Sequence, residues 1–262
     1  MDKNEILKNY YSTHNEDGRL LSRFGNVEFQ TTVRYIEKYL KKGDKIIEIG
    51  AGTGRYSHYF ARQGYEVDAV ELIDCNIDVF KANTQPGEKI TVDQGDAVDL
   101  KGVESEKYDI TLLLGPMYHL FEESDERAAL SEALRVTKKG GIVFASYVLN
   151  EMTVMNYMFA KNNIETDEMR EHIKKYGFIC GKIPEKILTI YRIEDVDKLM
   201  NGLNVEMLHR VGTDMFSGMI RPLLDSMSDE AYKYYIDYIF SICERPDVIG
   251  ASGHLLDVFR KE

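Results

Sequence analysis

The stretch that decides the fold is an apolar run leading directly into three glycines at alternate positions, Lys45-Ile46-Ile47-Glu48-Ile49-Gly50-Ala51-Gly52-Thr53-Gly54-Arg55-Tyr56. The apolar run is too short for a helix, and a helix-like pattern follows it from Arg55 to Gln63. We therefore predict a strand, a tight turn and a helix. Glycine suits such a turn because it accepts positive φ angles and lets a ligand touch the backbone. The N-terminus of the helix would offer free amide hydrogens to that ligand.

Short apolar strands and helices alternate along the chain after this turn. Strands are expected at 67–72, 89–97, 108–115, 142–147, 204–214 and 254–260. Helices are expected at 27–40, 76–83, 125–136, 193–200 and 229–243. Strands that alternate with helices predict an α/β fold with a mostly parallel sheet covered on both faces. Ligands on such sheets bind at the carboxyl ends of the strands.

Two regions depart from the alternation. Residues 1–40 read as a helical segment ahead of the fold proper, with a break expected at Gly25. The regular pattern also lapses at about 150–188, which we interpret as an insertion or substrate cap within a domain that spans 41–262. Eight of the eleven methionines lie between Met152 and Met219. Methionine fills irregular gaps in a core and also lines adaptable pockets, so both interpretations stay open.

Composition narrows the possible partners. The 262 residues carry 33 basic and 44 acidic side chains, a formal charge of −11 that opposes binding to nucleic acid. The three cysteines are widely separated and lack metal-ligand spacing, so we expect no metal site and a reduced, cytoplasmic protein. No apolar run approaches the roughly 20 residues of a membrane helix, so no membrane association is expected. We expect a monomer or a homodimer.

The spacing of the glycines excludes two common kinds of nucleotide-binding site. A dinucleotide fingerprint has the pattern Gly-x-Gly-x-x-Gly, and Arg55 stands here where its third glycine would be. The phosphate-binding Walker pattern also fails, because no Gly-Lys-Ser/Thr follows the turn. The turn is therefore typical of neither a pyrophosphate site nor a nucleoside triphosphate site.

Four stretches in order resemble the class I S-adenosylmethionine-dependent methyltransferases: 48–54, Val70-Glu71-Leu72, Gly95-Asp96-Ala97 and 108–114. The resemblance covers most of residues 43–147. It implies a Rossmann-like fold with a seven-stranded, mostly parallel sheet, helices on both faces and a last antiparallel strand. It also implies S-adenosyl-L-methionine as the methyl donor and S-adenosyl-L-homocysteine as the product.

The resemblance places the methionine part of the cofactor at the glycine turn. Glu48 would order the turn or bind the amino group through water. The cofactor would lie against the backbone of Gly50, Ala51, Gly52 and Gly54.

The next two strand ends would hold the ribose and the adenine. Glu71 can accept hydrogen bonds from both ribose hydroxyls, unless it is a solvated charge at a strand end. Asp96 would accept from the adenine amino group while the Ala97 amide donates to a ring nitrogen, although Asp96 could instead cap a turn. Leu72 and Val98 could sandwich the adenine ring or belong to the core.

Residues outside these stretches would complete the cofactor site. Leu114, at the end of the fourth strand, is expected to contact the cofactor. Related enzymes use a leading helix as a lid, so Tyr11 or Arg23 could meet the methionine carboxylate, or could simply pack at the surface.

The loop 114–120 lies where family members bring substrate-facing residues toward the methyl group. His119 could act as a general base, with an unperturbed pKa near ~6.5, or could be a structural imidazole. Tyr118 could hold the substrate by its ring or hydroxyl. The loop lacks the Asn/Asp-Pro-Pro-aromatic motif of enzymes that methylate amino groups of DNA, which argues against nucleobase amines.

The resulting hypothesis is methyl transfer to a small molecule enclosed by the N-terminal segment and the insertion. The alternatives are an RNA or protein methyltransferase, a non-catalytic protein that binds S-adenosylmethionine, and, more remotely, a nicotinamide oxidoreductase. The three cysteines, Cys75, Cys180 and Cys243, are expected to be free thiols.

Overall fold

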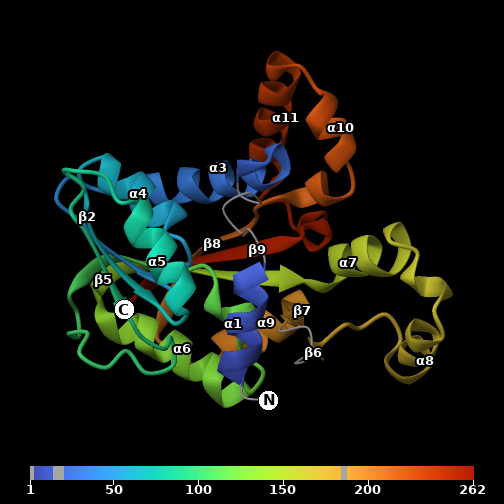
Figure 1. Cartoon of the computed structure of the whole chain (residues 1–262), viewed down its shortest axis with the longest axis horizontal. Helices are drawn as coiled ribbons and strands as arrows, with labels where there is room; N and C mark the ends of the chain where they lie inside the picture. Colours follow the sequence, from blue (N-terminus) through green and yellow to red (C-terminus); the bar gives the residue numbers. More distant parts are fainter. Residues whose placement is uncertain (1–2, 14–20, 184–187) are drawn as a thin grey trace.

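The structure, a computed structural model, describes residues 3–13, 21–183 and 188–262 and is built around one twisted sheet (Figure 1). Five parallel strands run in the order β3-β2-β1-β4-β5. Their bounds are β1 Lys45–Ile49, β2 Glu66–Glu71, β3 Ile90–Gln94, β4 Tyr108–Leu113 and β5 Thr137–Leu149. Their carboxyl ends therefore meet at one edge, next to the glycine turn that follows β1.

The last strands confirm the expected mixture of directions. β9 (His254–Lys261) lies antiparallel to β5, and β8 (Val205–Gly212) lies antiparallel to β9. A short hairpin adds two strands to the seven expected: β7 (Leu188–Tyr191) continues parallel to the end of β5, and β6 (Lys182–Ile183) pairs with β7. The sheet thus has nine strands within the described residues.

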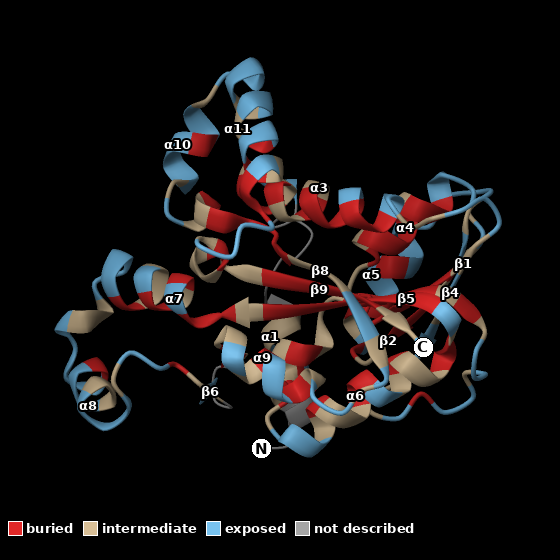
Figure 2. Cartoon of the chain, turned by 180° about the vertical axis from the view of Figure 1, so that it is seen from behind, coloured by how far each residue is buried: buried red, intermediate tan, exposed pale blue. Residues whose placement is uncertain are grey.

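Helices cover both faces of the sheet, as Figure 2 shows by the buried layer between them. On one face lie α3 (Arg23–Glu37) and α4 (Arg55–Arg62), which pack Ile36 and Phe60 against strand residues such as Phe144. On the other face lie α6 (Glu123–Val136) and α9 (Ile193–Met200), with Leu130 and Val196 in the core. Strands buried on both faces are expected to be apolar runs, which is why β1 and β4 were readable in the sequence.

The N-terminal segment contains α1 (Lys3–Thr13) and α3. The break expected at Gly25 was wrong: Gly25 lies in the first turn of α3, where its amide donates to Oγ of the N-cap residue Ser22 at 3.1 Å. Helix α1 packs on α5 (Asp74–Asn83) through Leu7 and Ile73, and Lys8 pairs with Asp74 at 3.0 Å. The role of residues 1–40 as a lid stays a prediction.

Two helical regions project beyond the ends of the strands (Figure 1). Within the expected insertion lie α7 (Asn150–Thr153), a π-helical turn (Val154–Ala160), a 3-10 turn (Asn163–Glu165) and α8 (Asp167–Tyr176). Between β8 and β9 lie a 3-10 turn (Met215–Gly218), α10 (Arg221–Ser226), α11 (Asp229–Ile242) and a second 3-10 turn (Ile249–Ala251). The boundaries expected for the insertion stay a prediction. Among the described residues, no helix combines the length and apolar character needed to cross a membrane.

Candidate functional site

A cavity lies at the carboxyl ends of β1, β2 and β4. All the predicted site residues line it except Arg23, Gly54 and Val98. Those brought together are Tyr11, Glu48, Gly50, Ala51, Gly52, Glu71, Leu72, Asp96, Ala97, Leu114, Tyr118 and His119. Segments that are far apart in sequence meet here because parallel strands deliver their following loops to one edge.

The three glycines of the turn all have positive φ angles, but they differ in the space available beside each of them. At Gly52, with φ of +56°, an added Cβ would meet no atom within 4 Å, so the backbone is open to a ligand. At Gly54, with φ of +88°, an added Cβ would lie 2.4 Å from Cδ2 of Phe80. At Gly50 it would lie 2.6 Å from Cγ of Pro116. Gly52 therefore forms the cradle, while Gly50 and Gly54 permit close packing around it.

Glu71 ties the glycine turn to the loop after β2. Its Oε2 accepts a hydrogen bond from the Gly52 amide at 2.8 Å, and its Oε1 accepts from the Ile73 amide at 3.0 Å and from Nδ2 of Asn76 at 3.1 Å. The side chain is buried, so it is not a solvated charge at a strand end. Hydrogen bonds from uncharged donors hold this carboxylate at the wall of the cavity.

Glu48 is buried below the turn. One carboxylate oxygen accepts from both the amide, at 2.9 Å, and the hydroxyl of Ser57 in the first turn of α4. Burial raises the pKa of Glu48 to about 8, although the hydrogen bonds from Ser57 act in the opposite direction. Glu48 therefore orders the start of α4, and its carboxyl keeps its proton to a higher pH than an exposed glutamate does.

Asp96 has the capping role of the two that the sequence left open, and its contact with adenine stays a prediction. Its Oδ1 accepts from the Val98 amide at 3.2 Å, which is a turn cap, and the residue also lines the cavity. Ala97 lines the cavity next to it, whereas Val98 packs on the core cluster that includes Val70 and Leu100.

Tyr118 and His119 belong to a 3-10 turn, Pro116–His119, that follows β4. The hydroxyl of Tyr11 on α1 lies 2.7 Å from Nε2 of His119. The rings of Tyr118 and His119 meet edge to face with centroids 4.7 Å apart. The contact with Tyr11 therefore anchors the loop to α1.

Arg23 lies outside the cavity. Its Nη1 donates to the carbonyl oxygens of Leu224 at 3.1 Å and Met227 at 2.5 Å, and its Nη2 pairs with Asp229 at 2.6 Å. The guanidinium also lies over the ring of Tyr232. Arg23 thus joins α3 to the turn between α10 and α11.

Two charged residues that were not predicted line the cavity. Arg55, at the start of α4, stacks 4.5 Å over the ring of Phe29, and its buried Nε has no hydrogen-bond partner among the described residues. Glu28 reaches the cavity from α3. Arg55 could have been found from its position beside the turn, whereas nothing in the local pattern distinguishes Glu28.

The methionines of the second half do not line this cavity within the described residues. Met152, Met158, Met169 and Met215 are buried, and two of them, Met158 and Met169, belong to the apolar cluster of the 150–190 region. Their interpretation as gap-fillers is therefore the better supported one.

Comparisons with known proteins agree with this architecture. Residues 46–141 match a family model described as a methyltransferase domain. A ribosomal protein L11 methyltransferase from Exiguobacterium sp. is 33% identical over 137 residues, covering 49% of this chain and 40% of that protein. An S-adenosyl-L-methionine-dependent Diels-Alderase from Talaromyces variabilis is 30% identical over 106 residues, covering 39% of this chain and 35% of that protein. The chain spans less than half the length of these curated relatives.

Among solved structures, a protein from Thermotoga maritima described as a possible histamine N-methyltransferase has a similar fold. It aligns with a TM-score of 0.58 over 100% of both chains at 16% identity. At this identity the likeness concerns the fold.

Proposed function

Because this chain carries a methyltransferase domain and has the fold of the class I S-adenosylmethionine-dependent methyltransferases, we propose that it transfers a methyl group from S-adenosylmethionine to a small-molecule acceptor. The observation that carries the proposal is one cavity in which the open backbone of Gly52 lies beside the carboxylates of Glu71 and Asp96. Those groups match the methionine, ribose and adenine parts of the donor.

The residues present fit this donor. The space at Gly52 would accept the methionine part, which a side chain there would fill. Glu71 is held at the wall by three hydrogen bonds, so its carboxylate is already oriented toward ribose hydroxyls. We assign the donor carboxylate to Arg55 rather than to Arg23, because Arg55 lines the cavity and its buried Nε has no partner within the described chain.

The donor, when bound, supplies a sulfonium methyl group that is already activated for transfer. The protein therefore has to position the acceptor in line with that group and exclude water. Leu7 and Tyr11 of α1 line the cavity and cover it from the side of α5. His119, on the wall formed by the loop after β4, is a candidate to receive a proton from the acceptor.

A small acceptor is favoured by enclosure and charge. Helix α1 lies over the cavity, and the net charge of −11 repels polyanions such as RNA. The L11 methyltransferase relatives make a protein acceptor the main alternative.

Methyl-tritiated S-adenosylmethionine tests the choice between these acceptors. The purified protein is incubated with the small-molecule fraction and, separately, with the macromolecular fraction of a cell extract. We expect label to enter soluble products. Label that enters only acid-precipitable protein or RNA would contradict the small-molecule assignment.

A further inference from the structure

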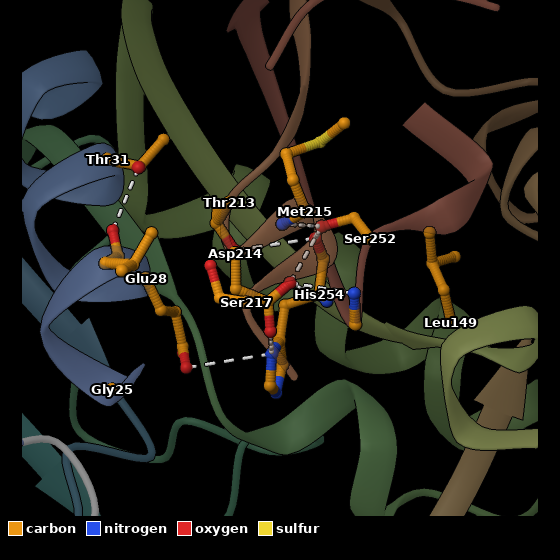
Figure 3. Close-up of polar contacts among 12 residues, drawn as sticks. Gly25, Glu28, Thr31, Leu149, Thr213, Asp214, Met215, Ser217, Ser252 and His254 are labelled. Atoms are coloured by element: carbon orange, nitrogen blue, oxygen red, sulfur yellow. Dashed lines mark hydrogen bonds and ion pairs between the residues drawn. The ribbon is translucent and has the colours of Figure 1, made fainter. Parts of the chain in front are cut away.

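A second group of ionisable side chains lies at the same edge of the sheet, outside the predicted donor site (Figure 3). It consists of Glu28 on α3, Asp214 just after β8 and His254 at the start of β9. Nδ1 of His254 lies 2.9 Å from Oδ2 of Asp214 and 3.6 Å from Oε2 of Glu28. Because His254 pairs with Val148 near the end of β5, the cluster lies at the carboxyl edge of the parallel strands.

Asp214 is a buried residue that orients His254, and not an acid at the surface. The residue is 1% exposed, and its Oδ1 accepts from the Ser252 hydroxyl at 2.8 Å and from the amides of Gly253 and His254 at 2.7 and 3.0 Å. Burial acts to raise the pKa of Asp214, but the charge and hydrogen bonds of His254, together with Ser252, outweigh it and lower that pKa. Asp214 is therefore ionised and fixes the orientation of the His254 ring.

Glu28 connects this cluster to the cavity. It lines the same cavity as Gly52 and His119, and its side chain is only 12% exposed. The donor site described above does not use it: Glu71 and Asp96 face the expected ribose and adenine, and Glu48 is bonded to Ser57. Glu28 is thus a lining carboxylate that the proposed donor contacts do not use.

We propose that Glu28 binds the amino group of a small amine acceptor, with His254 and Asp214 as positioning residues. The inference rests on the proposed function and names the acceptor class for it. Among the described residues, Glu28, Glu71 and Asp96 place three carboxylates on the wall of the cavity against one arginine, Arg55, while burial raises the pKa of Glu48 to about 8 and keeps that side chain neutral at pH 7. An ammonium group is attracted to such a wall, whereas an acceptor carboxylate is repelled.

Methylation of an amine requires a free lone pair on nitrogen, so an ammonium group must first lose a proton. Glu28 holds the ammonium group, and His119 on the facing loop receives the proton and passes it to solvent. The nitrogen then forms a bond to the methyl carbon, and the carbon–sulfur bond breaks with its electron pair staying on sulfur. For a primary amine the new ammonium product carries the positive charge that the sulfonium has lost.

The test measures binding to protein saturated with S-adenosylhomocysteine. Calorimetry compares 2-phenylethylamine, which is protonated at pH 7, with uncharged 2-phenylethanol of the same shape. We expect the amine to bind at least about tenfold tighter, which corresponds to about 1.4 kcal/mol. Glu28→Gln should abolish this preference while leaving the affinity for S-adenosylhomocysteine within about twofold. Glu37→Gln, the same change at an exposed site on α3, should leave both unchanged.

The positioning role is tested at His254. His254→Ala should reduce the preference for the amine, and His254→Asn, which keeps an N–H group for Asp214, should restore part of it. Equal binding of amine and alcohol, or a preference that survives Glu28→Gln, would overturn the proposal. A loss of S-adenosylhomocysteine affinity in Glu28→Gln would reassign Glu28 to the donor and also overturn it. If the unaltered protein does not bind S-adenosylhomocysteine, the proposed function itself fails.

Discussion

The hydroxyl oxygen of Tyr11 lies 2.7 Å from Nε2 of His119, and this contact joins α1 to the loop after β4 across the cavity. The two residues are 108 positions apart in sequence. Helix α1 also rests on α5 through Leu7 and Ile73. The hydrogen bond therefore links α1, which lines one wall of the cavity, to the loop proposed to face the acceptor.

Tyr11→Phe removes this hydrogen bond but keeps the ring. We expect S-adenosylhomocysteine to bind more weakly by about 0.5–1.5 kcal/mol, the usual net value of one hydrogen bond. Calorimetric titration measures the change. Tyr10→Phe is the matched control, because Tyr10 is on the same helix but does not line the cavity. Equal affinity in the Tyr11 variant would mean that α1 does not cover the bound cofactor.

The glycine turn gives a prediction that separates binding from folding. Gly52→Ala places a methyl group in open space, so it should cost about 1–2 kcal/mol of stability through its positive φ and weaken S-adenosylhomocysteine binding at least about tenfold. Gly54→Ala must also displace Phe80, so its stability loss should be larger by about 1–3 kcal/mol. Thermal unfolding and calorimetry measure the two effects. Normal affinity in Gly52→Ala would show that the turn does not contact the ligand.

Glu71→Ala should weaken S-adenosylhomocysteine binding by about 1–3 kcal/mol, because hydrogen bonds to a charged group are lost. It should also lower the unfolding temperature, since the amides of Gly52 and Ile73 lose their acceptor. Glu66→Ala on the same strand is the control, because Glu66 is exposed and pairs with Lys45. An unchanged dissociation constant would remove Glu71 from the donor site.

Glu48 makes the stability of the unliganded protein depend on pH. The pKa is raised from 4.5 to about 8 in the folded protein, so between these values the folded state holds a proton that the unfolded state has released. The free energy of unfolding contributed by this group therefore falls as the pH rises through that window. Glu48→Gln has no group that titrates at this position. The difference in unfolding temperature between this variant and the unaltered protein should therefore shift in favour of the variant between pH 5 and pH 8, by the amount that corresponds to the lost free energy of unfolding. A difference in unfolding temperature that stays constant from pH 5 to pH 8 would contradict the raised pKa of Glu48.

The sequence alone predicted the structure correctly wherever a few neighbouring residues determine it. The strand, turn and helix around Gly52 were predicted because each depends on a few consecutive residues, and the resemblance to class I methyltransferases is confirmed. Glu71 and Asp96 were placed at one edge because parallel strands end together. Gly25 was misread because a glycine is tolerated in the first turn of a helix that Ser22 caps.

Contacts between distant segments could not be read from the sequence. Arg23 was expected at the cofactor, but the turn between α10 and α11, about 200 positions later, supplies its partners. The same limitation hid the contact of Glu28 with His254, which depends on how α3 crosses the ends of β8 and β9. Local patterns therefore predicted the residues proposed for the donor, while the proposed acceptor side required the folded structure.

The affinity for S-adenosylhomocysteine tests the central claim most directly. A ligand that binds only the folded state raises the unfolding temperature, and the increase grows with the ratio of ligand concentration to dissociation constant. We predict that S-adenosylhomocysteine raises the unfolding temperature progressively with concentration, that NAD at the same concentration does not, and that the increase is smaller in Gly52→Ala. An unfolding temperature that saturating S-adenosylhomocysteine leaves unchanged, or that NAD raises instead, would contradict the account.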